Sequence, residues 1–213
     1  MKHYKNWYFP DTETHFIYYL DKSNLDTYQK KQRDASLKFV EKKRNAIDIG
    51  ANIGLWARDL CLIFDKVNLF EPQQQNIECL RKNLEGFSNF DLFEFALSNK
   101  NGTGELYIDD NGLGNNSLIP TKESTRKEVI NLMKLDDYNF KDIDYIKIDV
   151  QYHELEVIEG GIELLKSNSP VLCIEAARRN DDERSYVNKF TNILFNLDYK
   201  IVGGLGKELF FKK

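Results

Sequence analysis

The segment 45–56 joins a buried strand pattern to residues that could hold a ligand. Its sequence is NAIDIGANIGLW, and four of its residues could turn the chain or bind a polar group: Asp48, Gly50, Asn52 and Gly54. Gly50 would let the chain turn sharply after the strand, and Gly54 would let the next helix pack close to that strand. The unpaired N–H groups at the start of the helix would then face the ligand.

A carboxylate follows at the distance where nucleoside-binding folds place one. Glu71 ends the next apolar run. It comes about 20 residues after the glycine turn, where an acidic side chain binds ribose hydroxyls. An ordinary strand-to-helix turn with a surface glutamate would leave the same residues, but the combination favours a nucleoside site.

The spacing of the glycines narrows the kind of nucleoside. Dinucleotide sites use GxGxxG, whose middle glycine admits a pyrophosphate, whereas Gly50 and Gly54 form GxxxG with Asn52 between them. The sequence also has no phosphate-binding GK[ST] motif. These features favour S-adenosylmethionine, which has no pyrophosphate, and Asp48 could attract its amino group. The alternative role of Asp48 is to accept hydrogen bonds from backbone amides of the turn.

The sequence after residue 44 alternates between strand and helix patterns. Strands are predicted at 45–49, 66–71, 90–95, 105–109, 128–133, 142–150 and 170–176, and helices at 53–64, 73–85, 154–167 and 181–196. The end, 199–213, predicts an antiparallel hairpin about a Gly-rich turn. Alternation with continuously apolar strands predicts the α/β class with a mainly parallel, doubly wound sheet. The hairpin suits a methyltransferase sheet better than a dehydrogenase sheet.

Residues 1–44 are predicted to form an N-terminal extension of strands and a helix, packed on a domain that spans 45–213. Residues 1–20 are aromatic and loosely alternating, which predicts a strand pair. Residues 23–43 follow a helical stripe that Ser23 could cap.

Composition and patterning exclude several classes of protein. The 213 residues carry 34 acidic and 30 basic side chains, for a net charge of −4, and no long basic run, so a nucleic acid is not expected as a partner. The N-terminus lacks a signal peptide and the apolar runs are too short for a bilayer, so we expect a cytoplasmic protein without a membrane partner. The three cysteines lack CxxC spacing, which argues against a disulfide framework or a zinc site, and Cys61 and Cys173 should be core residues.

Six segments together resemble one known family. They are DIGANIGLW (48–56), LFEP (69–72), ALSNKNG (96–102), NNSL (115–118), LDDY (135–138) and KIDVQYHELEVIEGG (147–161). In this order they resemble the FkbM-type, S-adenosylmethionine-dependent methyltransferases. The resemblance implies a Rossmann-like methyltransferase fold and methyl transfer, usually to a hydroxyl of a sugar or other small metabolite. It also implies a group of residues around the cofactor: Asp48, Gly50, Asn52, Gly54, Glu71 and Ala96.

One position departs from the family pattern. After KID the family has V-[EQ]-G-[HYF]-E, whereas this chain has Tyr152 where glycine is expected. Tyrosine does not share the backbone freedom of glycine and fills the space that glycine leaves. Either the local turn differs, or the ring enters the pocket.

Two residues of this last segment are candidates for catalysis. Asp149 ends the strand next to the cofactor, so its carboxylate should face the cleft as a base, a metal ligand or a contact to the cofactor; the alternative is a cap for the next helix. His153 could be the base because histidine titrates near neutral pH, and the alternative is a surface residue. Glu154 could support either, and Glu175 ends the next strand and could reach the cleft. A divalent ion held by Asp149 with Glu175 or His153 is possible, but the spacing does not require one.

The sequence therefore predicts a methyltransferase that uses S-adenosylmethionine and a small hydroxyl-bearing acceptor, a carbohydrate or a glycosylated metabolite. Two rivals remain at this point: a module that binds S-adenosylmethionine without catalysis, for which Tyr152 is the reason, and a nicotinamide-dependent oxidoreductase. The loop DDNGLGNN at 109–116 is long enough to cover the cleft when a ligand binds.

Overall fold

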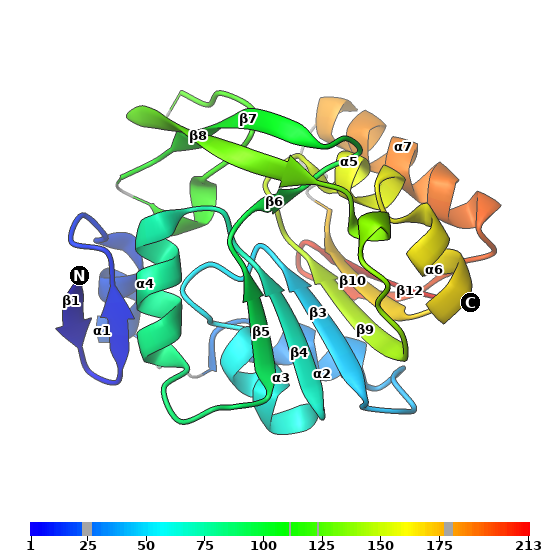
Figure 1. The fold of residues 1–213 in the computed structure, drawn as a ribbon, viewed down its shortest axis with the longest axis horizontal. Coiled ribbons are helices and arrows are strands. Elements are labelled where there is room, and N and C mark those ends of the chain that lie inside the picture. The colour runs from blue at the N-terminus through cyan, green and yellow to red at the C-terminus, as the bar shows by residue number, and fades with distance from the viewer. Residues whose placement is uncertain (23–26, 111, 123, 177–180) are drawn as a thin grey trace.

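A computed structural model describes residues 1–22, 27–110, 112–122, 124–176 and 181–213. Its centre is a sheet of seven strands in the order β11-β12-β10-β9-β3-β4-β5 (Figure 1). The strands span β3 Asn45–Ile49, β4 Lys66–Phe70, β5 Phe90–Phe93, β9 Ile143–Ile148, β10 Val171–Glu175, β11 Lys200–Leu205 and β12 Glu208–Lys212. Only β12 runs against its neighbours, because it pairs antiparallel with both β10 and β11. The predicted α/β fold, with its mainly parallel sheet and C-terminal hairpin, is confirmed.

Side-chain alternation sends the two faces of the sheet into two separate cores. On β3, Ile47 and Ile49 pack with α5 (Glu154–Glu159), α6 (Ile162–Asn168) and α7 (Asp181–Asn196). Ala46 faces the other side and packs with α3 (Ala57–Ile63) and with Leu80 of α4 (Gln74–Asn83). Because Asp48 shares the face of Ala46, its carboxylate must point toward the α3 side.

A second sheet lies beyond the carboxyl ends of β3, β4 and β5 (Figure 1). It has the strand order β6-β8-β7 and is formed by β6 (Ala96–Leu97), β7 (Gly102–Ile108) and β8 (Arg126–Met133). The strands predicted at 105–109 and 128–133 are therefore present and longer than expected. The separate sheet itself was not predicted, since strand patterns do not reveal which strands will pair.

The N-terminal residues form a hairpin and two helices. The hairpin β1 (Lys2–Tyr4) and β2 (Trp7–Phe9) confirms the predicted strand pair, and it is followed by α1 (His15–Lys22), which was not predicted. The predicted helix at 23–43 is reduced to α2 (Lys30–Leu37), and its proposed cap Ser23 lies outside the described residues. An apolar cluster joins this region to the rest of the chain: Trp7, Phe9, Phe16, Leu20, Ile53, Leu55 and Cys79.

Two helices differ from prediction for reasons that involve glycine. The helix predicted at 53–64 begins only at Ala57, because Gly54 has a left-handed φ of 93°. The helix predicted at 154–167 divides into α5 and α6 at Gly160 and Gly161. A Cβ on Gly160 would lie 2.0 Å from the Ser98 carbonyl oxygen, so the break coincides with a close approach of two main chains.

The cysteines and the helices also bear on the class of protein. Cys61 and Cys173 are buried, as predicted, and each of the three cysteines is free. In the part of the chain that the structure describes, no helix combines the length and the apolar character needed to span a bilayer.

Gly50 provides a direct test of the contact between β3 and β9. Its φ is 83°, and an added Cβ would lie 2.0 Å from the Asp149 carbonyl oxygen. Gly86 has a similar left-handed φ of 101°, but a Cβ there would meet nothing within 4 Å. We expect Gly86→Ala to cost about 1–2 kcal/mol of unfolding free energy from backbone strain alone. Gly50→Ala should cost several kcal/mol more or prevent folding, as measured by urea denaturation. Equal costs at the two positions would contradict the account of this contact.

Candidate functional site

A cavity of about 1010 Å³ opens at the carboxyl ends of β3, β4, β9 and β10. Small-molecule sites typically measure about 300–1,000 Å³, so this one has room for a nucleoside and a second molecule. In open α/β sheets ligands bind at this edge, where neighbouring strands connect to helices on opposite faces. Here β3 leads to α3 and β9 leads to α5, which cover opposite faces of the sheet.

Asp48 is the residue whose environment most clearly requires a ligand. Its side chain lines the cavity and is only 1% exposed, and neither carboxylate oxygen has a hydrogen-bond partner among the described residues. Burial raises the pKa of Asp48 to about 6, although the nearby Lys147 ammonium opposes this shift. A buried carboxylate without hydrogen bonds is costly. The suggestion that Asp48 bonds the amides of the turn is therefore wrong.

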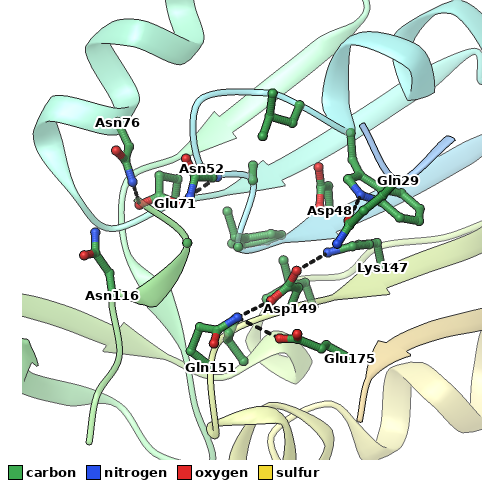
Figure 2. A pocket seen from close by; sticks show the side chains of 18 of the residues that line it. Gln29, Asp48, Asn52, Glu71, Asn76, Asn116, Lys147, Asp149, Gln151 and Glu175 are labelled. Atoms are coloured by element: carbon green, nitrogen blue, oxygen red, sulfur yellow. Dashed lines mark hydrogen bonds and ion pairs between the residues drawn. The ribbon is translucent and has the colours of Figure 1, made fainter. Parts of the chain in front are cut away.

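The turn after β3 is held by Glu71 (Figure 2). One Glu71 oxygen accepts a hydrogen bond from the Asn52 N–H at 2.8 Å, and the other accepts from the Gln73 N–H at 3.0 Å and from the Asn76 amide at 3.3 Å. Burial raises the pKa of Glu71 to about 7. Gly50, Asn52 and Glu71 all line the cavity. Glu71 therefore shapes the turn as well as facing the ligand space.

Ala96 and Gly54, which were also predicted to bind the cofactor, differ in their position relative to the cavity. Ala96 lines the cavity at the start of β6. Gly54 is not among the lining residues, and a Cβ there would meet Leu80 and Leu84 only at ordinary distances of 3.6 and 3.7 Å. The explanation that Gly54 allows close helix–strand packing is therefore wrong. Its left-handed φ is what requires glycine.

A row of hydrogen-bonded charged and amide side chains lines the cavity wall beside β9 and β10 (Figure 2). Asp149 accepts hydrogen bonds from the Lys147 ammonium at 3.1 Å and from the Gln151 amide at 2.9 Å. The same Gln151 amide donates to Glu175 at 2.7 Å. The side-chain NH₂ group of Gln151 therefore bridges the carboxylates of Asp149 and Glu175. The alternative role of Asp149 as a helix cap is wrong, since the residue before α5 is His153.

The two linked carboxylates have opposite pKa shifts. Burial would raise the pKa of Asp149, but the Lys147 ammonium and the hydrogen bonds hold it below its usual value. Burial and the neighbouring Asp149 charge raise the pKa of Glu175 to about 8. Of the two linked carboxyl groups, Asp149 therefore ionises more readily than Glu175.

His153 lines the cavity but is more enclosed than expected. Its Nε2 lies 3.1 Å from the Ser98 hydroxyl, and its Nδ1 lies 3.5 Å from Glu156. Burial, helped by the Lys100 charge, lowers the pKa of His153 to about 4. The expectation that His153 titrates near neutral pH is therefore wrong, although its role in catalysis stays a prediction.

Tyr152 has a left-handed backbone conformation of the kind that favours glycine. Its φ is 70°, and the preceding Gln151 also has a left-handed φ of 50°. The ring turns away from the large cavity, packs edge-on against Tyr186 and donates a hydrogen bond from its hydroxyl to Glu183 at 3.0 Å. The ring therefore does not enter the large cavity.

Several wall residues were not found from the sequence. The N-terminal segment contributes Tyr28 and Gln29, and the Gln29 side chain accepts a hydrogen bond from the Trp56 indole at 2.6 Å. Lys147 places its ammonium over the Trp56 ring, 4.9 Å from the centroid. Lys147 could have been found, because it lies two positions before Asp149 on the same face of β9. The N-terminal contacts carry no local sequence signal.

The predicted covering loop contributes a wall at the other side of the cavity. The described residues that line it are Gly112, Gly114, Asn115, Asn116, Ser117 and Leu118. The Ser117 hydroxyl donates to the Gln151 carbonyl at 2.6 Å, which fixes this loop against the turn after β9. Ordering of the loop by a ligand stays a prediction.

A metal ion has no evident cage in this wall. Among the described residues, no group of three or more His, Cys, Asp and Glu side chains is arranged to hold one. Asp149 and Glu175 are instead bound by Lys147, Gln151 and Lys207.

Comparison with known proteins finds one family whose model matches this chain. The family model described as Methyltransferase FkbM domain matches residues 48–201, which is most of the chain. No curated protein matches the chain in sequence.

Solved structures share the fold at low sequence identity. Methyltransferase FkbM from Methylobacillus flagellatus KT is 19% identical with a TM-score of 0.61, and the match covers 90% of this chain and 48% of that protein, so this chain spans about half its length. SMU.1697c from Streptococcus mutans, solved in complex with SAH, is 15% identical with a TM-score of 0.52 over 87% of this chain and 96% of that one. A SAM dependent methyltransferase from Aquifex aeolicus is 15% identical with a TM-score of 0.52 over 93% and 95%.

The buried charge of Asp48 gives a prediction about stability. Its pKa is about 6 in the folded protein against 3.8 for the ordinary side chain. The folded state therefore binds more protons between these values, and the wild type loses stability as pH rises through this window. Asp48→Asn should be about as stable as the wild type at pH 4 and more stable at pH 8, by on the order of 1–3 kcal/mol. Urea denaturation at both pH values measures this difference. A variant that is less stable at pH 8 than at pH 4, relative to the wild type, would show that Asp48 is satisfied within the protein.

Proposed function

The chain belongs to the FkbM methyltransferase family, and from this premise we propose that it transfers a methyl group from S-adenosylmethionine to a hydroxyl oxygen of a small molecule. The proposed acceptor is a sugar or a glycosylated metabolite. The observation that carries the proposal is the buried Asp48 carboxylate, which faces a large cavity and has no hydrogen-bond partner among the described residues.

The residues around Asp48 fit the proposed cofactor. Asp48 would accept hydrogen bonds from the amino group of the cofactor, which would provide the missing positive charge. Glu71 has capacity beyond its three protein hydrogen bonds, because a carboxylate has about four acceptor sites, so it can also accept from a ribose hydroxyl. When bound, S-adenosylmethionine would supply a methyl group already made electrophilic by a sulfonium.

The protein itself must position the acceptor hydroxyl and accept its proton. The cavity must hold an acceptor hydroxyl opposite the sulfur, and positioning of this kind supplies much of the rate in such reactions. The hydroxyl proton must leave as the new O–C bond forms. We propose that Asp149 orients this hydroxyl and accepts its proton, because Asp149 lines the cavity and is held ionised by Lys147. His153 stays a second candidate, acting as a neutral imidazole.

The structure bears on both rival functions. The case for a non-catalytic module rested on Tyr152, whose ring lies outside the large cavity. The case for a nicotinamide-dependent enzyme is weakened by the family match and by a turn built without the middle glycine. We also do not propose a nucleic-acid acceptor, because the sequence has no long basic run that would bind its phosphates.

The cofactor can be tested by calorimetry with S-adenosylhomocysteine and NAD. We expect the protein to bind S-adenosylhomocysteine, and a concentration of 100 times Kd should raise its stability by about 2.7 kcal/mol. Glu71→Gln should weaken binding about tenfold or more, because a charge-assisted hydrogen bond is worth about 1.5–3 kcal/mol. Glu78→Gln, at an exposed position of α4, is the matched control and should change nothing. Micromolar binding of NAD with no response to S-adenosylhomocysteine would overturn the proposal.

Asp149 can be tested by transfer of a labelled methyl group to a panel of sugars. Asp149→Asn should lower turnover about a hundredfold, the usual scale for the loss of acid–base help, while the affinity for S-adenosylhomocysteine changes little. Asp91→Asn, an exposed residue of β5 paired with Lys66, serves as the control. Full activity in Asp149→Asn would exclude Asp149 as the base and leave His153 or positioning by the cavity.

His153 needs a test that separates a base from a structural contact. With a pKa of about 4, His153 stays neutral throughout the neutral range. His153→Ala should lower turnover about a hundredfold if the imidazole takes the proton. The ratio of wild-type to variant activity should then be constant from pH 6 to 9. Rescue by His153→Gln, which keeps a hydrogen bond to Ser98, would show a structural role instead.

A further inference from the structure

Two glutamates face each other across the strand pair β10–β12. Glu175 and Glu208 are direct partners in the antiparallel register, and both side chains line the cavity. Two carboxyl groups directly opposite each other are unfavourable in a sheet once both are ionised. An arrangement of this kind at a cavity wall is explained if a positively charged group binds between or beside the two carboxylates.

The described residues provide no hydrogen-bond partner for one carboxylate oxygen of Glu208. Its side chain is 1% exposed, and its Oε2 atom has no hydrogen-bond partner among the described residues. Burial raises the pKa of Glu208 above its usual value, which again reflects a poorly solvated carboxylate. Glu208 is among the residues that line the cavity, so its unpartnered oxygen lies close to the ligand space.

The neighbouring ammonium groups are directed at other carboxylates. The Lys147 ammonium forms an ion pair with Asp149 at 3.1 Å, and the Lys207 ammonium forms one with Glu175 at 2.9 Å. Neither of these two ion pairs satisfies the Oε2 atom of Glu208. A carboxylate or phosphate on the ligand would be repelled at this end of the cavity, whereas a hydrogen-bond donor with positive charge would be attracted.

We propose that Glu208, together with Glu175, binds a protonated amino group on the methyl acceptor, so that the acceptor is a hydroxylated amine such as an amino sugar. This inference rests on the proposed function, since it takes the same cavity to be the site of methyl transfer. Gln151 joins Glu175 to Asp149 through hydrogen bonds of 2.7 and 2.9 Å. An acceptor held by its amino group therefore carries its neighbouring hydroxyl toward Asp149. A protonated amine has no free electron pair, which leaves the hydroxyl as the nucleophile.

Binding of three related sugars tests the proposal. Glucosamine, glucose and N-acetylglucosamine are titrated into the full chain at pH 7 by ligand-observed NMR, both with and without S-adenosylhomocysteine. We expect glucosamine to bind roughly tenfold more tightly than the two neutral sugars, as expected for a charge-assisted hydrogen bond. Glu208→Gln should remove this preference.

The stability of the variant shows whether the loss is specific. Glu208→Gln replaces a buried carboxylate that has one unpartnered oxygen with a neutral amide, so the free protein should be at least as stable as the wild type in urea. Glu105→Gln, on β7 outside the cavity, is the control and should keep the preference for glucosamine.

Two results would overturn the inference. One is equal or undetectable binding of glucosamine relative to glucose in the wild type, which includes a site that recognises neutral polyols. The other is an unchanged preference in Glu208→Gln. If S-adenosylhomocysteine still binds in either case, the proposed function stands and only the acceptor class is wrong. If S-adenosylhomocysteine does not bind, the proposed function fails separately.

Discussion

A side chain at position 50 would collide with the main chain of β9, since an ideal Cβ there lies 2.0 Å from the Asp149 carbonyl oxygen. At the same point the Asp149 N–H donates to the Ile49 carbonyl at 3.0 Å, so the ends of β3 and β9 are held in contact. The chain then leaves these strands toward opposite faces of the sheet, and the cavity opens between the two connections. The same register places Asp48 directly beside Lys147. The contact between the ends of β3 and β9 therefore determines both the position of the cavity and the pairing of Asp48 with Lys147.

The charges in the cavity do not balance within the protein. Burial raises the pKa values of Asp48, Glu71 and Glu175 to about 6, 7 and 8, and both Asp48 and Glu208 have carboxylate oxygens without hydrogen bonds. A folded protein retains groups like these at a cost in stability, which is common where a ligand must be bound. Positive or hydrogen-bond-donating groups on two ligands, one near β3 and one near β12, would offset this cost. The cavity wall therefore suits ligands that donate hydrogen bonds or carry positive charge.

Patterns local in sequence were predicted well, and contacts between distant segments were not. Apolar strands and glycine turns identified the sheet and its edge, and α7 has the predicted bounds, because each signal lies within a few neighbouring residues. Asp48, Glu71 and Asp149 were found because strand ends share one edge of the sheet. The separate β6-β8-β7 sheet and the wall formed by Gln29 depend on tertiary packing. The acidity of His153 was mispredicted because burial, which the sequence does not show, controls it.

The central claim is that Asp48 is left without partners in order to bind the amino group of the cofactor. A crystal structure of the protein with S-adenosylhomocysteine tests it most directly. We expect the amino group of the ligand within about 2.7–3.2 Å of an Asp48 oxygen, and a ribose hydroxyl at a similar distance from Glu71. A bound ligand whose amino group lies elsewhere, with the Asp48 carboxylate still facing no donor, would contradict this account of the site.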